Sequence, residues 1–365
     1  MRKKEKYKKK IHIVGTVGLP ADYGGWETMV ENISKDLCQE YEITVYCSSK
    51  HYKKEISNHP HANLRYLPLK ATGWQSIIYD YISILSSIYF RADVILILGV
   101  SGCTILPFVR LFKRPTIITN IDGLEWKRGK WGFFAKLFLK ISEYFAVRFS
   151  HKVIGDNVEI VRYINKNYNK NAYFIAFGGS SRDGIDNLSL SKITSQPFAL
   201  NISRIEPENN IHLILEACLK EKLHIHIFGR WNANDYSRKL YQQYADSEYC
   251  NLHEHLSNQK ILNAYRKKSL VYIHGHSVGG TNPSLVEAMS WGIPIFAFDV
   301  IYNVETTFNS ALYFSNVDDL RYLIKSMDPI KMSEISKKMQ QLHNENYEWK
   351  VISGKYSEHF KIQKN

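Results

Sequence analysis

The chain has 365 residues, of which 44% are hydrophobic, so it is long enough to bury the cores of two domains. Its formal net charge of +13 predicts an anionic partner, such as a membrane surface, a nucleic acid or a phosphorylated ligand. A mean hydropathy of −0.30 argues against a membrane-embedded protein, and five scattered cysteines indicate reduced thiols rather than a disulfide framework.

The chain begins with the basic run MRKKEKYKKK. No apolar segment of signal-peptide type follows it, so we expect no cleaved signal. The longest apolar stretch, 74–90, contains Asp80 and several serines, and it is shorter than the roughly 20 apolar residues of a membrane-spanning helix. We therefore expect a soluble or peripheral protein.

Apolar runs alternate with amphipathic stretches through the first half of the chain. The runs are continuous rather than alternating, which is typical of parallel strands covered on both faces. Helical patterns over 26–41 and 157–168 complete a βαβα order and predict a doubly wound α/β domain. The predicted strands are 11–17, 42–48, 63–69, 93–99, 115–121, 152–156 and 172–177.

A polar segment, 178–197, predicts a linker, and the same pattern then restarts. We expect two Rossmann-like α/β domains, 1–180 and 181–345, facing a cleft that holds the site. A C-terminal helix over 346–365 is expected to pack back toward the first domain. In the second half, the predicted strands are 198–203, 224–229, 270–275 and 293–298, and the predicted helices are 210–221, 258–268 and 285–292.

The first strand runs into GTVGLPADYGGWE. Gly24 and Gly25 precede a predicted helix, where they would let a phosphate or sugar approach its N-terminus; a simple tight turn is the alternative. The segment lacks the pattern GxGxxG, and no acidic residue ends the second strand. A nicotinamide-dependent oxidoreductase is therefore disfavoured.

The segment TNIDGLEWKRGKWG follows another apolar strand. Asp122 is expected at the carboxyl end of that strand, where a carboxylate would take a proton from an attacking hydroxyl; capping of the next turn is the alternative. Glu125, Lys127 and Arg128 are candidate contacts for an anionic acceptor, or solvated surface charges.

The segment SRIEPENN opens the second half and places Arg204 just after a strand. A guanidinium there suits bidentate binding of phosphate, although a surface salt bridge with Glu206 or Glu208 would also explain it. Further on, GHSVGGTNPSLVE joins glycines to a helix N-terminus, which favours a diphosphate. Glu287 inside that helix would face ribose hydroxyls.

These motifs, together with EAMSWGIP at 287–294, resemble retaining glycosyltransferases of GT-B fold, family 4, over nearly the full length of the chain. More narrowly, the chain looks like the bacterial rhamnosyltransferase subgroup. That resemblance implies transfer from dTDP-L-rhamnose to a polyprenyl-diphosphate-linked saccharide in capsule or cell-wall polysaccharide synthesis. A transferase using a UDP- or GDP-sugar is the alternative.

The resemblance also implies a role for each matching residue. Gly24 and Gly25 would line the junction of donor and acceptor, and Asp122 takes the place of a catalytic-site histidine of many relatives. Arg204 would bind the diphosphate, Glu287 the ribose, and a loop would bring backbone to the diphosphate or sugar: Gly280, Thr281 and Asn282.

Two departures from the family pattern qualify these roles. Asn209 replaces a lysine of many relatives, and Gly279 replaces a glutamate that contacts hydroxyls of the donor sugar. The second change fits a deoxysugar such as rhamnose. Both also leave open a non-catalytic relative. Whether the anomeric configuration is retained or inverted, with Asp122 acting as a direct base, stays open.

No D-x-D motif occurs, so we expect no metal and no cofactor beyond the nucleotide-sugar cosubstrate. The pairs His224/His226, His253/His255 and His274/His276 could each place two imidazoles on one strand face, but a further ligand at a recognised spacing is missing.

Residues 127–152 combine lysines with an aromatic stripe at helical spacing: Phe134, Phe138, Ile141, Phe145 and Phe149. This pattern fits the headgroup boundary of an anionic membrane, although the phenylalanines could instead face the core. We expect a cytoplasmic protein, peripheral on the inner face of the plasma membrane. Nucleic acid is a disfavoured partner, because no DNA- or RNA-binding motif accompanies the charge.

Overall fold

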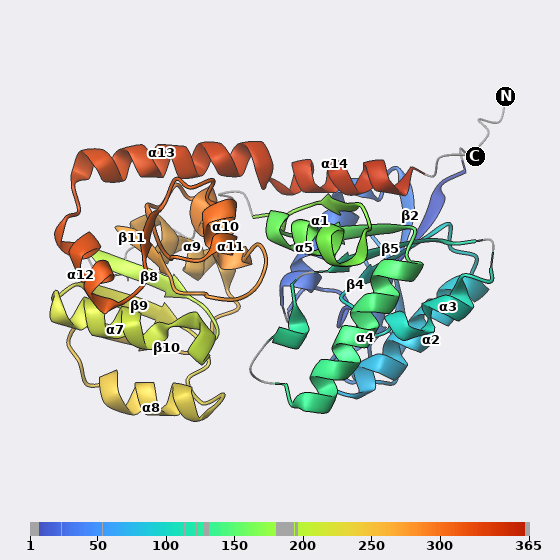
Figure 1. Ribbon diagram of the computed structural model, residues 1–365, viewed down its shortest axis with the longest axis horizontal. Coiled ribbons are helices and arrows are strands. Elements are labelled where there is room, and N and C mark those ends of the chain that lie inside the picture. Colours follow the sequence, from blue (N-terminus) through green and yellow to red (C-terminus); the bar gives the residue numbers. More distant parts are fainter. Residues whose placement is uncertain are drawn as a thin grey trace. The chain divides into compact units, whose positions relative to one another are not determined.

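A computed structural model describes residues 7–361 except 23, 53, 113, 122, 128–130, 180–192 and 194–195 (Figure 1). The chain forms two compact units. The first contains the described residues up to Ala176 together with those from Trp349 onward, and the second runs from Phe177 to Glu348. In the described part of the chain, no helix is both long and apolar enough to cross a membrane.

The first unit is built on a parallel sheet of seven strands in the order β3-β2-β1-β4-β5-β6-β7. The central strand β4 is apolar along its whole length and buried from end to end, as its continuous pattern predicts, and β5 is buried after its first residue. The strands are β1 (Lys9–Val14), β2 (Tyr41–Ser48), β3 (Asn63–Leu67), β4 (Val94–Leu98), β5 (Thr116–Ile121), β6 (Lys152–Gly155) and β7 (Ala172–Phe174).

Helices cover both faces of this sheet. The connections β3–β4, β4–β5 and β5–β6 all advance in one direction along the sheet, and right-handed crossovers therefore place their helices on the same face. These helices are α2 (Gln75–Tyr89), α3 (Leu106–Val109) and α4 (Phe133–Phe149), which Figure 1 shows together. The connection β1–β2 runs the opposite way, through α1 (Gly25–Leu37). Helix α5 (Val158–Tyr168) joins β6 to β7.

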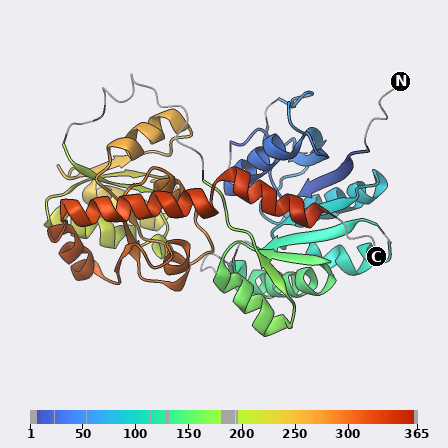
Figure 2. The ribbon, with the colours of Figure 1, turned by 90° about the horizontal axis from the view of Figure 1, so that it is seen from above.

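The C-terminal helix α14 (Trp349–Phe360) belongs to the first unit, where it lies beside α1 (Figure 2). The Ser353 hydroxyl donates to the Asp36 carboxylate at 2.7 Å, and the Tyr41 and Ser357 hydroxyls lie 2.9 Å apart. Buried aromatic side chains of α14 complete the core on this side. Side-chain packing and hydrogen bonds thus attach the chain's last helix to its first domain.

The second unit holds a parallel sheet of six strands in the order β10-β9-β8-β11-β12-β13. The strands are β8 (Phe198–Ile202), β9 (His224–Phe228), β10 (Cys250–His253), β11 (Val271–His274), β12 (Ile295–Phe298) and β13 (Leu312–Phe314). The helices are α7 (Ile211–Lys220), α8 (Asp235–Tyr244), α9 (Gln259–Lys268), α10 (Pro283–Ser290), α11 (Ile301–Thr306), α12 (Val317–Lys325) and α13 (Pro329–Asn346). The edge strands β10 and β13 and the helices α8, α11, α12 and α13 are absent from our sequence prediction.

Candidate functional site

The second sheet reverses its strand order between β8 and β11. From β8 the chain continues through α7 to β9 on one side, and from β11 it continues through α10 to β12 on the other. Ligands of doubly wound sheets bind beyond the carboxyl ends of the strands at such a switch point. Arg204 follows β8 by two residues, and the loop 275–282 follows β11 directly. Both predicted donor-binding segments therefore start at this switch point.

The two segments are joined by hydrogen bonds and by a close backbone approach. Ser277 donates to the carbonyl oxygen of Glu208 from its backbone N–H at 2.9 Å and from its hydroxyl at 2.8 Å. The Asn210 amide donates to the carbonyl of Gly275 at 2.9 Å. A Cβ added at Gly275 would lie 2.2 Å from the carbonyl oxygen of Asn209. Only glycine fits at this position, because real Cβ atoms essentially never come that close.

Arg204 has a half-exposed side chain, 54% accessible, and its guanidinium lies 3.5 Å from the Glu206 carboxylate. The salt bridge considered from sequence therefore forms, with Glu206 as the partner. An exposed pair of this kind contributes little to stability, so the guanidinium can exchange this carboxylate for another anion. Asn209, which replaces the lysine of many relatives, is buried, and its amide donates to the Arg204 carbonyl at 2.7 Å. Asn209 thus fixes the turn that carries Arg204.

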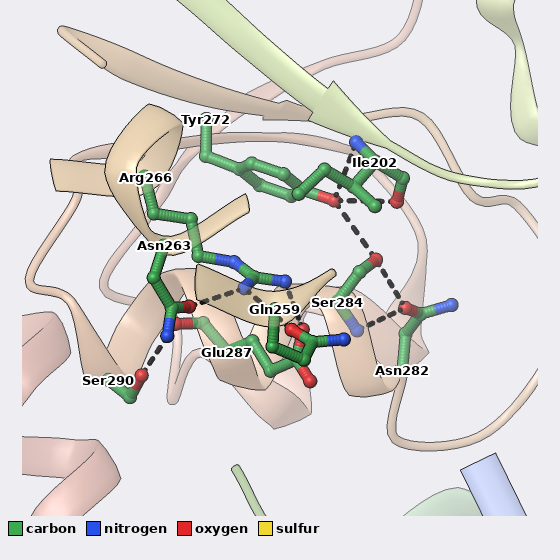
Figure 3. A network of polar contacts seen from close by, with 9 residues as sticks. All are labelled: Ile202, Gln259, Asn263, Arg266, Tyr272, Asn282, Ser284, Glu287 and Ser290. Carbon is green, nitrogen blue, oxygen red and sulfur yellow. Dashed lines mark hydrogen bonds and ion pairs between the residues drawn. The ribbon is translucent and has the colours of Figure 1, made fainter. Parts of the chain in front are cut away.

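The loop ends at Asn282, which caps α10. The Asn282 side chain accepts from the Ser284 N–H at 3.0 Å and from the Ser284 hydroxyl at 2.8 Å, and Pro283 occupies the first helical position. The Tyr272 hydroxyl lies 2.9 Å from the Ser284 hydroxyl and 3.1 Å from the carbonyl oxygen of Ile202 (Figure 3). This chain of contacts ties the start of α10 to the end of β8.

Gly279 and Gly280 precede the cap, and Thr281 between them and Asn282 is buried. Gly279 has φ +132°, a backbone conformation that residues other than glycine rarely adopt. A Cβ built at this position would meet nothing within 4 Å. The position at which many relatives carry a glutamate therefore has both open space and a backbone that disfavours a glutamate.

The Glu287 carboxylate forms an ion pair with Arg266 of α9 (Figure 3). The Arg266 side chain is only 3% exposed, and that of Glu287 is 17% exposed. Arg266 also donates to Asn263 at 2.8 Å and to Gln259 at 3.2 Å. The sequence pattern did not single out Arg266, because an R-K-K run at the end of a helix is typical of solvated charges near the negative helix terminus.

One of the three histidine pairs, His274/His276, forms an aromatic stack, and a second stack joins His226 and His253 from different pairs. The His274 and His276 rings lie 4.4 Å apart and nearly parallel, at the end of β11. Burial lowers the pKa of His274 to about 3, so its imidazole is neutral. His226 hydrogen-bonds His253 across neighbouring strands at 2.8 Å. Among the described residues, no group of three or more His, Cys, Asp or Glu side chains is arranged to hold a metal ion.

In the first unit, Gly24 is the N-cap of α1, and Gly25 is its first residue. Sequence reasoning missed Glu27, whose buried carboxylate accepts from the Thr16 hydroxyl at 2.6 Å and from the Val17 N–H at 2.8 Å. Glu27 therefore holds the β1–α1 loop against the helix that the glycines open. An acidic residue in a helix's first turn is common, which is why the pattern did not distinguish it.

The predicted acceptor segment is only partly described. Asp122 and Arg128 lie outside the described residues. Glu125 and Lys127 lie in a short 3-10 turn, Glu125–Lys127. The Glu125 carboxylate accepts from the Trp131 indole at 3.3 Å, and the Lys127 ammonium lies 5.5 Å from the centre of the Trp126 ring.

Comparisons with known proteins agree with this architecture. Residues 187–349 match the family Glycosyl transferases group 1, and residues 8–180 match a domain of unknown function, DUF1972. The second half of the chain is therefore a glycosyltransferase group 1 domain. Over 180 residues the chain is 24% identical to the "UDP-N-acetylglucosamine--peptide N-acetylglucosaminyltransferase GtfA subunit" of Streptococcus pneumoniae serotype 4, which covers 47% of this chain and 35% of that protein. The chain thus matches about a third of the length of this curated relative.

Solved structures show the same fold across nearly the whole chain. Sucrose-phosphate synthase from Thermosynechococcus elongatus has a TM-score of 0.81 at 14% identity, covering 97% of this chain and 98% of that one. Alr3699/HepE of Anabaena, in complex with UDP-glucose, has a TM-score of 0.72 at 13% identity, covering 97% and 99%. Trehalose-6-phosphate synthase OtsA has a TM-score of 0.74 at 10% identity, covering 98% and 100%. The two parallel α/β sheets therefore form the GT-B glycosyltransferase fold, as the sequence predicts.

Proposed function

We propose that this protein transfers a sugar, L-rhamnose from dTDP-L-rhamnose, to a polyprenyl-diphosphate-linked saccharide in polysaccharide biosynthesis. The observation that carries the proposal is the switch point between β8 and β11. There a half-exposed guanidinium, Arg204, and the N-terminus of α10 start from one edge of the sheet in a glycosyltransferase group 1 domain. A diphosphate would bind the guanidinium and the free N–H groups of the helix.

The donor sugar is argued from Gly279. A side chain at this position would have to adopt a left-handed backbone conformation, so the chain does not carry the carboxylate that would recognise an additional sugar hydroxyl. This favours a deoxysugar. A UDP- or GDP-sugar is the competing donor, and UDP-N-acetylglucosamine is included in the test because it is the donor named for the pneumococcal relative.

The first unit would receive the acceptor at the loops of Gly24, Gly25 and 123–127, with Asp122 as the group that takes the proton of the attacking hydroxyl. Arg204 and α10 would neutralise the diphosphate without a divalent cation. We place the reaction on the cytoplasmic face of the plasma membrane, because a polyprenyl-linked acceptor and a net charge of +13 both favour an anionic bilayer surface.

The experiment is a thermal-unfolding panel of the purified protein with dTDP-L-rhamnose, dTDP, UDP-N-acetylglucosamine, UDP-glucose, GDP-mannose, NAD and a short oligonucleotide. A ligand at a hundred times its Kd stabilises the folded state by about 2.7 kcal/mol. The largest shift with dTDP-L-rhamnose supports the proposal. A larger shift with another nucleotide sugar would identify that sugar nucleotide as the donor instead. A shift with only NAD or the oligonucleotide would refute glycosyl transfer.

A matched pair of variants locates the donor. Arg204→Ala should abolish most of the shift with dTDP. Arg238→Ala, which removes a guanidinium of similar exposure (48%) paired with Asp235 in the same unit, should leave this shift unchanged.

Transfer to a lipid-linked saccharide should persist in EDTA, and loss of turnover in EDTA would contradict metal-independent transfer.

A further inference from the structure

Helix α2 presents a row of large apolar side chains outward, although its buried side is partly polar. The side that faces the core carries Asp80, Ser83 and Ser87, each at most 2% exposed, together with the fully buried Tyr79 and Ile84. The side that faces outward is a stripe of large apolar side chains at helical spacing. These are Trp74 (72% exposed), Ile78 (43%), Ile82 (41%), Leu85 (48%) and Tyr89 (80%).

A surface helix normally turns its apolar stripe toward the core and its polar residues toward water. Here the buried serines donate to backbone carbonyls of the helix itself: Ser83 to that of Tyr79 and Ser87 to that of Ser83, each at 2.8 Å. Asp80 accepts from Ser101. The buried polar side chains of α2 therefore have partners, and the row of apolar side chains points outward.

Helices α3 and α4 extend this apolar surface on the same face of the sheet (Figure 1). More than half of the large apolar side chains that are exposed in the described part of the chain come from α2, α3, α4 and the residues beside them. A patch of this extent on one face marks an interaction surface. Helix α3, the residues that follow it and helix α4 contribute Phe108 (68%), Leu111 (80%), Phe112 (53%), Phe133 (76%), Phe134 (83%), Leu137 (49%), Ile141 (44%) and Tyr144 (49%).

Of the stripe predicted from sequence over 127–152, only Phe134 and Ile141 are exposed. Phe145 and Phe149 stack on each other, with ring centres 5.6 Å apart, and are half-buried, as is Phe138. The five side chains therefore do not form one exposed stripe, and three of them are turned partly toward the protein, as the alternative considered from sequence expects. The helix turns a different set outward, because its buried side is formed by Ser142, Glu143, Ala146 and Val147.

The charges around the patch have one sign. Lys70 and Arg91 flank the two ends of α2, and both are exposed. Arg110, Arg114, Lys127 and Arg148 are exposed around α3 and α4. Among the described residues of 70–152, every acidic side chain is buried or half-buried: Asp80, Asp93, Glu125 and Glu143.

We propose that the α2–α3–α4 face docks on an anionic lipid bilayer, with α2 lying in the headgroup boundary. Trp74 and Tyr89 at the two ends of the stripe suit that boundary because their rings are amphipathic, and the flanking cations would meet lipid phosphates. Because this assigns the surface that would bring the enzyme to a lipid-linked acceptor, the inference rests in that respect on the proposed function.

The test is flotation of the purified protein with vesicles of phosphatidylcholine containing phosphatidylglycerol, compared with phosphatidylcholine alone. Ile78→Gln/Ile82→Gln/Leu85→Gln should lower partitioning by on the order of tenfold or more, since three apolar side chains no longer enter lipid. A second variant, Phe133→Ser/Phe134→Ser, should weaken binding independently. The matched control Tyr322→Gln/Ile330→Gln removes side chains of similar exposure, 71% and 72%, from the second unit, and it should bind like the wild type.

Equal vesicle binding by wild type and both face variants would overturn the proposal. So would a dimer, measured by sedimentation without lipid, that the α2 variant dissociates, because a second copy would then cover this face. Donor-induced thermal shifts are recorded for every variant. A variant that loses vesicle binding but keeps the thermal shift with the donor would show that the substitution affects only the membrane-binding surface. A wild type that binds vesicles but no nucleotide sugar would refute only the proposed function.

Discussion

Replacing Arg266 by methionine tests whether the buried ion pair of the second unit controls the candidate ribose carboxylate. Methionine keeps much of the side-chain volume and removes the cation, which leaves the largely buried Glu287 carboxylate without its partner. It also removes the donor to Asn263 and Gln259. Breaking a buried pair costs about 3–5 kcal/mol. We take the lower end, about 3 kcal/mol, because Glu287 keeps 17% exposure and water can reach it.

The expected loss is measurable by calorimetry. For a domain of this size about 3 kcal/mol corresponds to a fall in Tm of roughly 6–12 °C. The control is Lys267→Met on the same helix, where the side chain is exposed, and it should change stability by less than about 0.5 kcal/mol. A double-mutant cycle with Glu287→Gln separates the pair from the arginine's other contacts, because the second substitution removes the stranded charge.

If Arg266 positions Glu287, its loss should also raise the Kd for dTDP more than Lys267→Met does. The reasoning is refuted if Arg266→Met unfolds within a degree or two of the wild type, or if the coupling energy with Glu287→Gln is within about 0.5 kcal/mol of zero. A stable variant with weakened nucleotide binding would instead show that Arg266 supports nucleotide binding without a measurable contribution to stability.

Three further perturbations test other parts of the fold and the site. Arg204→Ala should weaken binding of dTDP but not of thymidine, measured by calorimetric titration, with little change in Tm because the side chain is half-exposed. Burial raises the pKa of Asp80 to about 7, so the folded state holds a proton that the unfolded state releases near pH 4. The free energy of unfolding, compared with that of Asp80→Asn, should therefore fall by about 4 kcal/mol as the pH rises from about 4 to 7. A difference between the two proteins that stays constant with pH in urea unfolding would contradict this. Gly275→Ala should destabilise by about 1–3 kcal/mol and weaken dTDP binding, because its Cβ would meet the carbonyl of Asn209 at 2.2 Å, whereas Gly354→Ala in open space on α14 should not lower Tm.

The sequence predicts most of the fold because buried parallel strands leave a direct signal. The continuous apolar run over 93–99 contains β4, Val94–Leu98, and the run over 270–275 contains β11, Val271–His274. The edge strand β10 is missed because its sequence, CNLH, is short and mostly half-buried, so it has neither a continuous nor an alternating apolar pattern.

The candidate site residues likewise fall into those that a local sequence pattern predicts and those that it does not. Arg204, Asn282 and Glu287 are predicted because each stands at a fixed distance from a strand end or a helix start. Arg266 and Glu27 are missed because their position within a helix gives them an ordinary surface interpretation. Their burial depends on what another segment places opposite them, and no local pattern encodes that.

The ion pair also bears on how the proposed site would meet the charge of a diphosphate. Because Arg266 is paired with Glu287, this pair adds no net charge to the switch point, and Arg204 with the N-terminus of α10 would supply the positive charge. Arg204 is exposed, and a bound diphosphate would have to displace its partner Glu206. An interaction of this kind is strongly screened by salt. Nucleotide binding should therefore weaken as ionic strength rises, while the thermal stability contributed by the buried Arg266–Glu287 pair should change little.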